Sequence, residues 1–286
     1  MQDKRWRLSV TLIAGWITND NHGPSSSYIL SDSRISWPGN LGYYDYAKKV
    51  FSIEYTPDIL GYCGNVLFPS MILQQIEILI NNQLLFDLNA KSSERSEIIY
   101  NQIKEHYDRY PVSQKTGISI FHISRDSKGN SSKFFVFDYS YDKTTETWSR
   151  KEILPKNDDL TPLAFCAGSG KGAYLKKYAD YQQGNNQRTS RNPFQCFCKY
   201  LSETKDDSVG GPPQLAGLFR TNQGMPFGIV WNDQRFMFGS RINGNSKLDY
   251  NKVRWFNSNM ERCDGNTMAI LQGAKRQPDP NIIKQE

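Results

Sequence analysis

The side chains that most often bind metals or nucleotides lack the required spacing in this chain. His22, His106 and His122 fall in a predicted loop, helix and strand and share no ligand spacing. The glycine-rich stretch at residues 168–172 invites comparison with a phosphate-binding loop. The first glycine of that motif would fall at Phe165, however, and glycine follows the lysine where serine or threonine is required. We therefore predict neither a metal site nor a nucleotide site.

The five cysteines are interpreted as free thiols in a reducing compartment, because an odd number cannot all pair with one another. Cys196 and Cys198 lack the spacing of zinc or redox pairs. Cys63 is the best placed to act as a nucleophile, since it lies at a predicted glycine turn. A small buried thiol is the simpler interpretation of the same residue.

Charge and hydropathy exclude several classes of protein. The 286 residues carry a formal net charge of +6, and the basic side chains are scattered among acidic ones. No run of about 18 uncharged apolar residues occurs, and the first 16 residues lack the pattern of a signal peptide. We therefore predict a soluble cytoplasmic protein with no nucleic-acid partner and no membrane partner.

The elements that must position any site begin with strands. Four apolar runs separated by turn signals predict antiparallel strands at residues 10–16, 28–30, 49–53 and 59–63. Apolar residues then take helical spacing from about residue 69 to 80, and a second helix is predicted at about 96–107. The first third of the chain therefore predicts a sheet followed by two helices.

The remainder repeats this order. Alternating apolar residues at 117–123 and 133–137 predict a hairpin, extended by residues 148–154. The later predicted elements are a strand at 163–167, helices at about 173–181 and 192–203, and strands at 214–219 and 227–231. Two pairs of helices suit two sheets packed face to face, although this order alone permits other α+β layouts. We predict one domain over residues 1–272 and a disordered tail over 273–286.

Four short stretches, in this order along the chain, resemble the proteasome β-subunit family of N-terminal-nucleophile hydrolases. They are TLIAG at 11–15, ILSDSR at 29–34, KKV at 48–50 with ILGYCG at 59–64, and GSG at 168–170 with DDSVGG at 206–211. The resemblance implies a four-layer αββα sandwich in which two antiparallel sheets lie between pairs of helices. It covers about three quarters of the chain.

The resemblance also implies a set of catalytic roles. Thr11 would be the nucleophile, and its own α-amine, once terminal, would accept the hydroxyl proton. Lys49 would supply positive charge beside the hydroxyl, and Asp32 would keep Lys49 charged and oriented. The remaining implied roles are orientation of the amine by Ser169 and Asp206, and donation to the oxyanion by the backbone N–H of Gly64. This chemistry requires no metal and no organic cofactor.

Two positions depart from the family pattern. Val209 stands where the family often has a serine, and Ser208 could substitute for it. Ten residues precede Thr11, and Val10 stands where self-processing precursors usually have glycine. Removal of these residues could follow autolysis or cleavage by another protease. A translation start downstream of Met1 is the other route.

Such an internal start leaves two candidate nucleophiles. Initiation at Val10 would expose Thr11 after methionine removal. Initiation at Leu8 would instead expose Ser9, which lies two residues away on the same strand face.

These observations predict a threonine-type N-terminal-nucleophile hydrolase that cleaves peptide or other amide bonds through an acyl-enzyme. The alternative is a catalytically inactive subunit that serves as a scaffold or binding module, which needs no processing before Thr11. The resemblance implies a homo-oligomer, with an unfoldase or another subunit as a further partner. The sequence does not identify the substrate.

Overall fold

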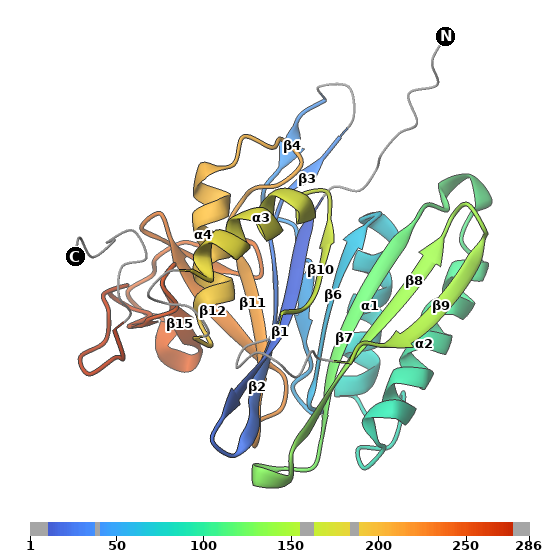
Figure 1. The fold of residues 1–286 in the computed structure, drawn as a ribbon, viewed down its shortest axis with the longest axis horizontal. Coiled ribbons are helices and arrows are strands. Elements are labelled where there is room, and N and C mark those ends of the chain that lie inside the picture. The colour runs from blue at the N-terminus through green and yellow to red at the C-terminus, as the bar shows by residue number, and fades with distance from the viewer. Residues whose placement is uncertain (1–10, 38–40, 155–162, 184–188, 277–286) are drawn as a thin grey trace.

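The computed structural model describes residues 11–37, 41–154, 163–183 and 189–276. Within them, the strands form one nine-stranded sheet, one five-stranded sheet and one two-stranded sheet (Figure 1). The two larger sheets are built almost entirely from antiparallel pairs of strands. Thr11 and the residues that contact it lie where these two sheets meet.

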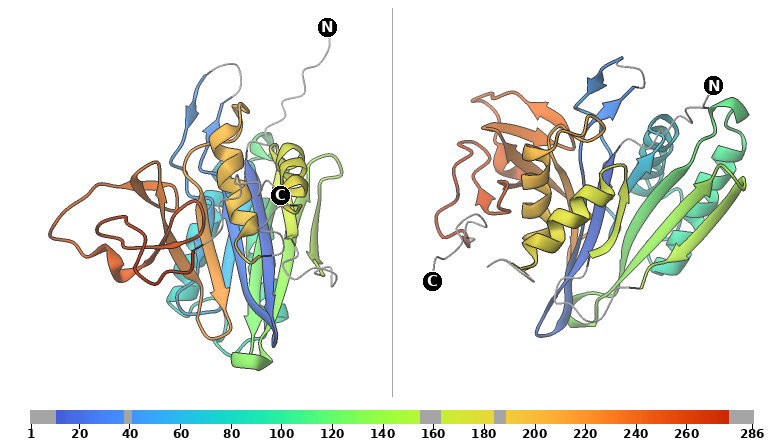
Figure 2. Two further views of the ribbon diagram at one scale, coloured as in Figure 1. Left: turned by 60° about the vertical axis from the view of Figure 1, so that its left-hand side comes forward. Right: turned by 45° about the horizontal axis from the view of Figure 1, so that its top comes forward.

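The nine-stranded sheet runs in the order β10-β1-β2-β11-β12-β13-β14, with β15 beside β12 and β16 beside β15. Its strands are β1 (Leu12–Asp20), β2 (Gly23–Ser31), β10 (Leu163–Gly168), β11 (Gln214–Phe219), β12 (Met225–Trp231), β13 (Gln234–Met237), β14 (Ser240–Ile242), β15 (Arg254–Phe256) and β16 (Arg262–Cys263). The C-terminal strands lie on the opposite side of the molecule from β8 and β9 (Figures 1 and 2).

The five-stranded sheet follows chain order, β5-β6-β7-β8-β9. Its strands are β5 (Val50–Ser52), β6 (Asp58–Gly64), β7 (Ile118–Asp126), β8 (Lys133–Asp142) and β9 (Thr147–Glu152). A separate hairpin of β3 (Ile35–Ser36) and β4 (Tyr43–Tyr44) projects from one end of the molecule (Figure 2).

Four α-helices occur in the described residues: α1 (Leu67–Asn81), α2 (Ser92–Asp108), α3 (Lys171–Tyr181) and α4 (Asn192–Glu203). Apolar residues of α1 and α2 pack with those of the five-stranded sheet, and apolar residues of α3 and α4 pack with those of the nine-stranded sheet. A third apolar cluster contains residues of both larger sheets. No helix among the described residues is long and apolar enough to cross a bilayer.

The predicted fold class, a four-layer αββα sandwich of two antiparallel sheets between helix pairs, was wrong. The structure is rich in sheet, with 36% strand and 26% helix, and the described residues contain 16 strands in three sheets with only four α-helices. One pair in the largest sheet, β12 with β15, is parallel. The prediction failed because it ended the strands at residue 231, whereas β13–β16 follow, and because it did not foresee the β3–β4 hairpin.

Side-chain alternation along β1 explains how this strand serves two layers of the core. Leu12, Ala14 and Trp16 belong to the cluster that contains α3 and α4. Ile13 and Ile17 belong to the cluster between the two larger sheets. Because successive side chains of a strand point to opposite faces, Thr11 is on the same face as Ile13 and points toward the five-stranded sheet.

The start of α2 depends on a distant residue. The predicted helix began near residue 96, whereas α2 begins at Ser92. The carboxylate of Asp126 accepts hydrogen bonds from the Ser92 backbone N–H and from the Ser92 hydroxyl, each at 2.7 Å. A carboxylate that accepts from the first helical N–H groups stabilises a helix start. Local sequence alone therefore could not locate the beginning of this helix.

A buried polar network joins α2 to the five-stranded sheet. The Asp58 carboxylate lies 2.7 Å from Nε2 of His122 and 2.9 Å from Nε of Arg95, and all three side chains are buried. Nδ1 of His122 lies 2.7 Å from the Tyr139 hydroxyl. Arg95 also donates to the hydroxyl of Ser124 at 2.6 Å. His122 is therefore a structural residue of the sheet.

This network predicts acid sensitivity of the fold. Burial alone would raise the pKa of Asp58, but its hydrogen bond with His122 and the charges of His122 and Arg95 outweigh burial and hold that pKa well below its usual value. A depressed pKa in the folded state stabilises the protein above the unfolded-state pKa, near 4, and this contribution is lost as pH falls further. We expect the free energy of unfolding to decrease by roughly 2 kcal/mol between pH 5 and pH 2.

Urea unfolding across this pH range measures the effect. Asp58→Asn should flatten the decrease, since the variant has no carboxylate to protonate. Asp180→Asn, at an exposed position of α3, should retain the wild-type slope. Equal slopes in wild type and Asp58→Asn would place the acid sensitivity elsewhere.

Candidate active site

Three polar side chains from separate strands meet where the two larger sheets approach each other. Thr11 precedes β1, Asp32 follows β2 and Lys49 precedes β5. Nζ of Lys49 lies 3.0 Å from the Thr11 hydroxyl oxygen and 2.8 Å from Oδ1 of Asp32. All three residues are fully buried. The lysine therefore donates to both the hydroxyl and the carboxylate.

Pairing of β1 with β2 brings the first two of these residues together. Ile13 is opposite Ser31 in the antiparallel register. One residue further along, the Asp32 N–H donates to the Leu12 carbonyl at 3.2 Å, and the Leu12 N–H donates to Oδ1 of Asp32 at 3.0 Å. The carboxylate is therefore held at the strand end beside Thr11.

The Asp32 carboxylate is satisfied by several donors. Besides Lys49 and the Leu12 N–H, it accepts from the N–H groups of Arg34 at 3.2 Å and Gly210 at 3.0 Å. A buried carboxylate is tolerated in a protein only when it is paired and hydrogen-bonded in this way. A β-carbon at Gly210 would lie 2.4 Å from the Arg34 guanidinium carbon, so a larger residue there would have to displace the Arg34 side chain. Asp32 therefore fixes the position of the lysine.

Burial changes the acidity of the lysine. Loss of hydration lowers the pKa of Lys49, and the charge and hydrogen bond of Asp32 oppose this lowering. The carbonyl of Arg34 accepts a further hydrogen bond from Nζ. The ammonium is thus surrounded by three oxygen atoms, one of which is the Thr11 hydroxyl. Lys49 is therefore a more acidic donor than an exposed lysine would be.

A second line of hydrogen bonds leads to the backbone nitrogen of Thr11. This nitrogen donates to Oγ of Ser169 at 3.3 Å, and the hydroxyls of Ser169 and Ser208 are 2.7 Å apart. The Ser208 hydroxyl donates to Oδ1 of Asp206 at 2.6 Å. Asp206 thus reaches Thr11 through two serines. Val209, at the position where a serine was expected, is instead buried in the apolar core.

One predicted site residue, Gly64, lies outside the hydrogen-bonded cluster that the described residues form. It ends β6, the strand paired with β5, and is opposite Ile118 of β7. Its φ of +100° and the 2.6 Å separation between an added β-carbon and the Gly117 carbonyl oxygen both require glycine. The structure therefore places Gly64 on the strand beside that of Lys49.

Gln214 was not foreseen from the sequence, although it holds the cluster together. It is fully buried at the start of β11. Its carbonyl oxygen accepts from the Lys49 N–H at 3.0 Å, and its amide nitrogen donates to the Asp32 carbonyl at 3.1 Å and to the Ser33 hydroxyl at 2.8 Å. One side chain thus links the strand of Lys49 to the turn of Asp32. The only signal in the sequence was an amide residue at the beginning of an apolar strand.

Cys63 does not have the character of a nucleophilic cysteine. Burial raises the pKa of its thiol to about 12, and the nearby charge of Lys49 lowers it only in part. A reactive cysteine needs a lowered pKa, because the thiolate is the nucleophile. All five cysteines are free, as predicted. Within the described residues, no group of three His, Cys, Asp or Glu side chains is arranged to hold a metal ion.

Of the comparisons with known proteins, only the one with solved structures finds similar proteins. No protein-family model matches the chain, and no curated protein matches it. One similar solved structure is Anbu (ancestral beta-subunit) from Yersinia bercovieri, with 13% identity and a TM-score of 0.49, covering 80% of this chain and 86% of that one. Another is an Anbu mutant from Hyphomicrobium, with 12% identity, a TM-score of 0.47 and coverage of 79% and 86%.

The predicted relationship to the proteasome β-subunit family is corrected by these findings. The two similar structures named above are Anbu proteins rather than proteasome β-subunits, and family models give no match. At this identity and TM-score the neighbours do not identify a function. What the chain can do chemically has to be inferred from the geometry of its own residues.

Proposed function

We propose that the protein is a threonine-type N-terminal-nucleophile hydrolase that cleaves peptide or other amide bonds. The observation that supports this most directly is the 3.0 Å separation between the Thr11 hydroxyl and the buried ammonium of Lys49, which Asp32 holds in place. A hydroxyl is a weak nucleophile until a nearby base takes its proton, and a neighbouring cation favours the alkoxide. The site supplies the cation directly.

The base would be the α-amine of Thr11 in a form of the chain that begins at that residue. Such an amine has a pKa of about 8, so a large fraction of it can accept a proton near neutral pH. In the full chain the same nitrogen is an amide, which is no base. Ser169, linked through Ser208 to Asp206, already accepts a hydrogen bond from this nitrogen and would orient the amine.

The reaction would proceed in two steps with balanced proton transfers. The amine takes the hydroxyl proton, Oγ of Thr11 attacks the substrate carbonyl carbon, and the C–N bond breaks as the amine returns the proton to the leaving nitrogen. Water then attacks the resulting ester, and the threonine hydroxyl is regenerated with release of the carboxylic acid. In this proposal the backbone N–H of Gly64 would donate to the oxyanion of both tetrahedral intermediates.

A covalent probe tests the proposal on two forms of the protein. One form begins at Thr11, released from a carrier that is cleaved immediately before that residue, and the other retains residues 1–10. After incubation with a peptide vinyl sulfone, we expect a mass adduct on Thr11 in the first form and none in the second. A correctly folded first form that gains no adduct and hydrolyses no peptide amide would overturn the proposal.

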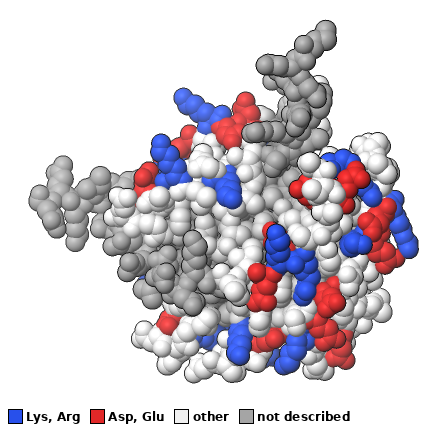
Figure 3. Space-filling model, turned by 45° about the vertical axis from the view of Figure 1, so that its right-hand side comes forward, with Lys and Arg blue, Asp and Glu red and all other residues white. Residues whose placement is uncertain are grey.

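A second candidate function is a catalytically inactive binding subunit. The observation that favours it is the complete burial of Thr11 in the full chain, which keeps the hydroxyl from any substrate. Positive and negative side chains are interspersed on the face shown in Figure 3, which offers no single charged surface to a partner. N-terminal sequencing of the native protein separates the candidates, since a chain that retains residues 1–10 supports the binding subunit.

A further inference from the structure

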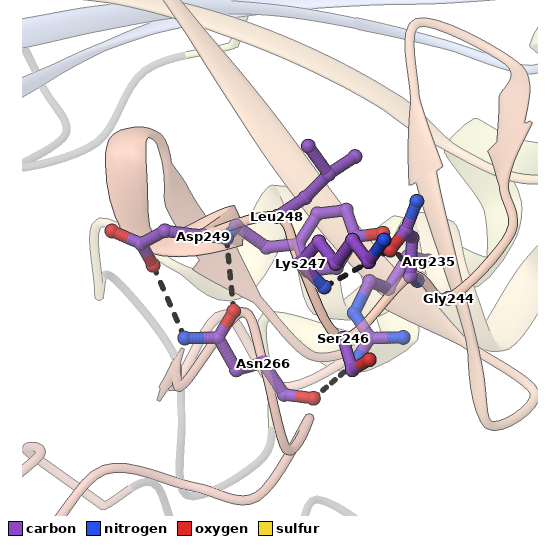
Figure 4. A pocket seen from close by; sticks show the side chains of 9 residues that line it. Arg235, Gly244, Ser246, Lys247, Leu248, Asp249 and Asn266 are labelled. Carbon is purple, nitrogen blue, oxygen red and sulfur yellow. Dashed lines mark hydrogen bonds between the residues drawn. The ribbon is translucent and has the colours of Figure 1, made fainter.

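A pocket of about 470 Å³ lies at the C-terminal end of the nine-stranded sheet, away from Thr11. Its wall is the loop of residues 244–250 together with Asn266, and Arg235 of β13 lines its interior (Figure 4). Hydrogen bonds fix the shape of this loop. The Tyr250 hydroxyl accepts from the Asn245 N–H at 2.8 Å, and the Tyr250 N–H donates to the Asn266 side chain at 2.9 Å.

Arg235 is an unusual residue because its buried charge lacks a counterion. The residue is 9% exposed, and its Nε and Nη2 donate to the backbone carbonyls of Gly265 and Asn266. No carboxylate of the described chain forms an ion pair with it. Its third nitrogen, Nη1, faces Gly244 in the pocket wall. Buried cations are normally paired with an anion, and none of the described carboxylates pairs with Arg235, so we expect its partner to come from beyond the described residues.

The charges around the pocket indicate which anion would fit. Arg235 and Lys247 contribute two positive charges, and Asp249 contributes one negative charge. Asp249 is already engaged, because it accepts from the Asn251 N–H at 3.0 Å and from the Asn266 side chain at 3.1 Å. In Figure 4 the side chains of Arg235, Ser246 and Lys247 lie on one side of the pocket and Asp249 on the other. The net charge of the lining, +2 − 1 = +1, matches a monoanion.

We propose that this pocket binds a small monocarboxylate, with its carboxylate against Arg235 and Lys247. A guanidinium suits a carboxylate because its planar N–H groups match the two carboxylate oxygens. A doubly charged phosphate is disfavoured because the lining neutralises only one negative charge. This binding site is independent of the function proposed for Thr11 and requires no processing of the chain.

Isothermal titration calorimetry on the full chain tests this inference, with butanoate as the probe and butanamide as its uncharged analogue. Ionic strength is kept constant with chloride. We expect saturable binding of butanoate at one site, no binding of butanamide, and weaker binding of inorganic phosphate. Lys247→Gln should weaken butanoate binding about tenfold, since it removes one charged partner at an exposed position.

Arg241→Gln is the matched control, because Arg241 is an exposed arginine of β14 that does not line the pocket. It should bind butanoate as tightly as wild type. Arg235→Gln should abolish binding. If Arg235→Gln fails to fold, the result with Lys247→Gln decides instead. Absence of saturable butanoate binding, tighter binding of phosphate, or an equal loss in Arg241→Gln and Lys247→Gln would each overturn the inference.

Discussion

Replacing Thr11 with alanine, in the form that begins at residue 11, should reduce amide hydrolysis by on the order of a thousandfold or more. The alanine variant keeps the α-amine but has no oxygen to attack the substrate carbonyl. Thr11→Ser retains a hydroxyl at the same position and should keep most of the activity. The measurement is kcat/KM for release of a fluorophore from a peptide amide.

The alanine variant should otherwise resemble the wild type. Thr11 contributes one side-chain hydrogen bond, from Nζ of Lys49, which Asp32 and the Arg34 carbonyl continue to satisfy. Thr18→Ala, in the same strand but outside the cluster, is a control for loss of a buried hydroxyl. Activity that persists in Thr11→Ala at the wild-type level would exclude Thr11 as the nucleophile. Ser9, which lies outside the described residues, is absent from this form and could not account for such activity.

The sequence predicted the core of the candidate site better than its surroundings. Thr11, Asp32 and Lys49 were assigned through the resemblance of short motifs to the proteasome β-subunit family, and the structure brings the three side chains within hydrogen-bond distance. Ser208 was foreseen as a substitute for the serine absent at Val209, and it does connect Ser169 with Asp206. Their catalytic roles stay predictions.

The residues that the sequence did not reveal act through long-range contacts. Gln214 lies 165 residues from the lysine whose backbone it holds, so no local pattern marks it. The same reason applies to α2, whose start is stabilised by Asp126 from a strand 34 residues away. The short strands β13–β16 contain two to four residues each, too few for a recognisable alternation of side chains. Such elements form only because neighbouring strands already exist.

The second large effect is expected from the buried ion pair of Lys49 and Asp32. Removing the lysine should lower both the free energy of unfolding and the hydrolytic activity. Lys49→Met leaves the Asp32 carboxylate fully buried without its cation, and we expect a loss of roughly 3 to 5 kcal/mol in the free energy of unfolding. Activity of the form that begins at Thr11 should fall to background, since no positive charge stabilises the alkoxide. Lys48→Met is the matched control. Its partly exposed pair with Glu77 should contribute less than about 1 kcal/mol.

A double-mutant cycle separates the cost of the unpaired charge from the loss of lysine packing. Asp32→Asn removes the negative charge but keeps an oxygen that can accept from the Leu12 or Gly210 N–H. Combined with Lys49→Met, it should therefore recover about 1 to 3 kcal/mol relative to the sum of the two single losses. The double variant should nevertheless stay inactive. It regains stability but still lacks the Lys49 ammonium beside the Thr11 hydroxyl. Strict additivity in urea unfolding would show that Lys49 and Asp32 do not stabilise each other, and the inferred role of Asp32 in holding the lysine would then have to be abandoned.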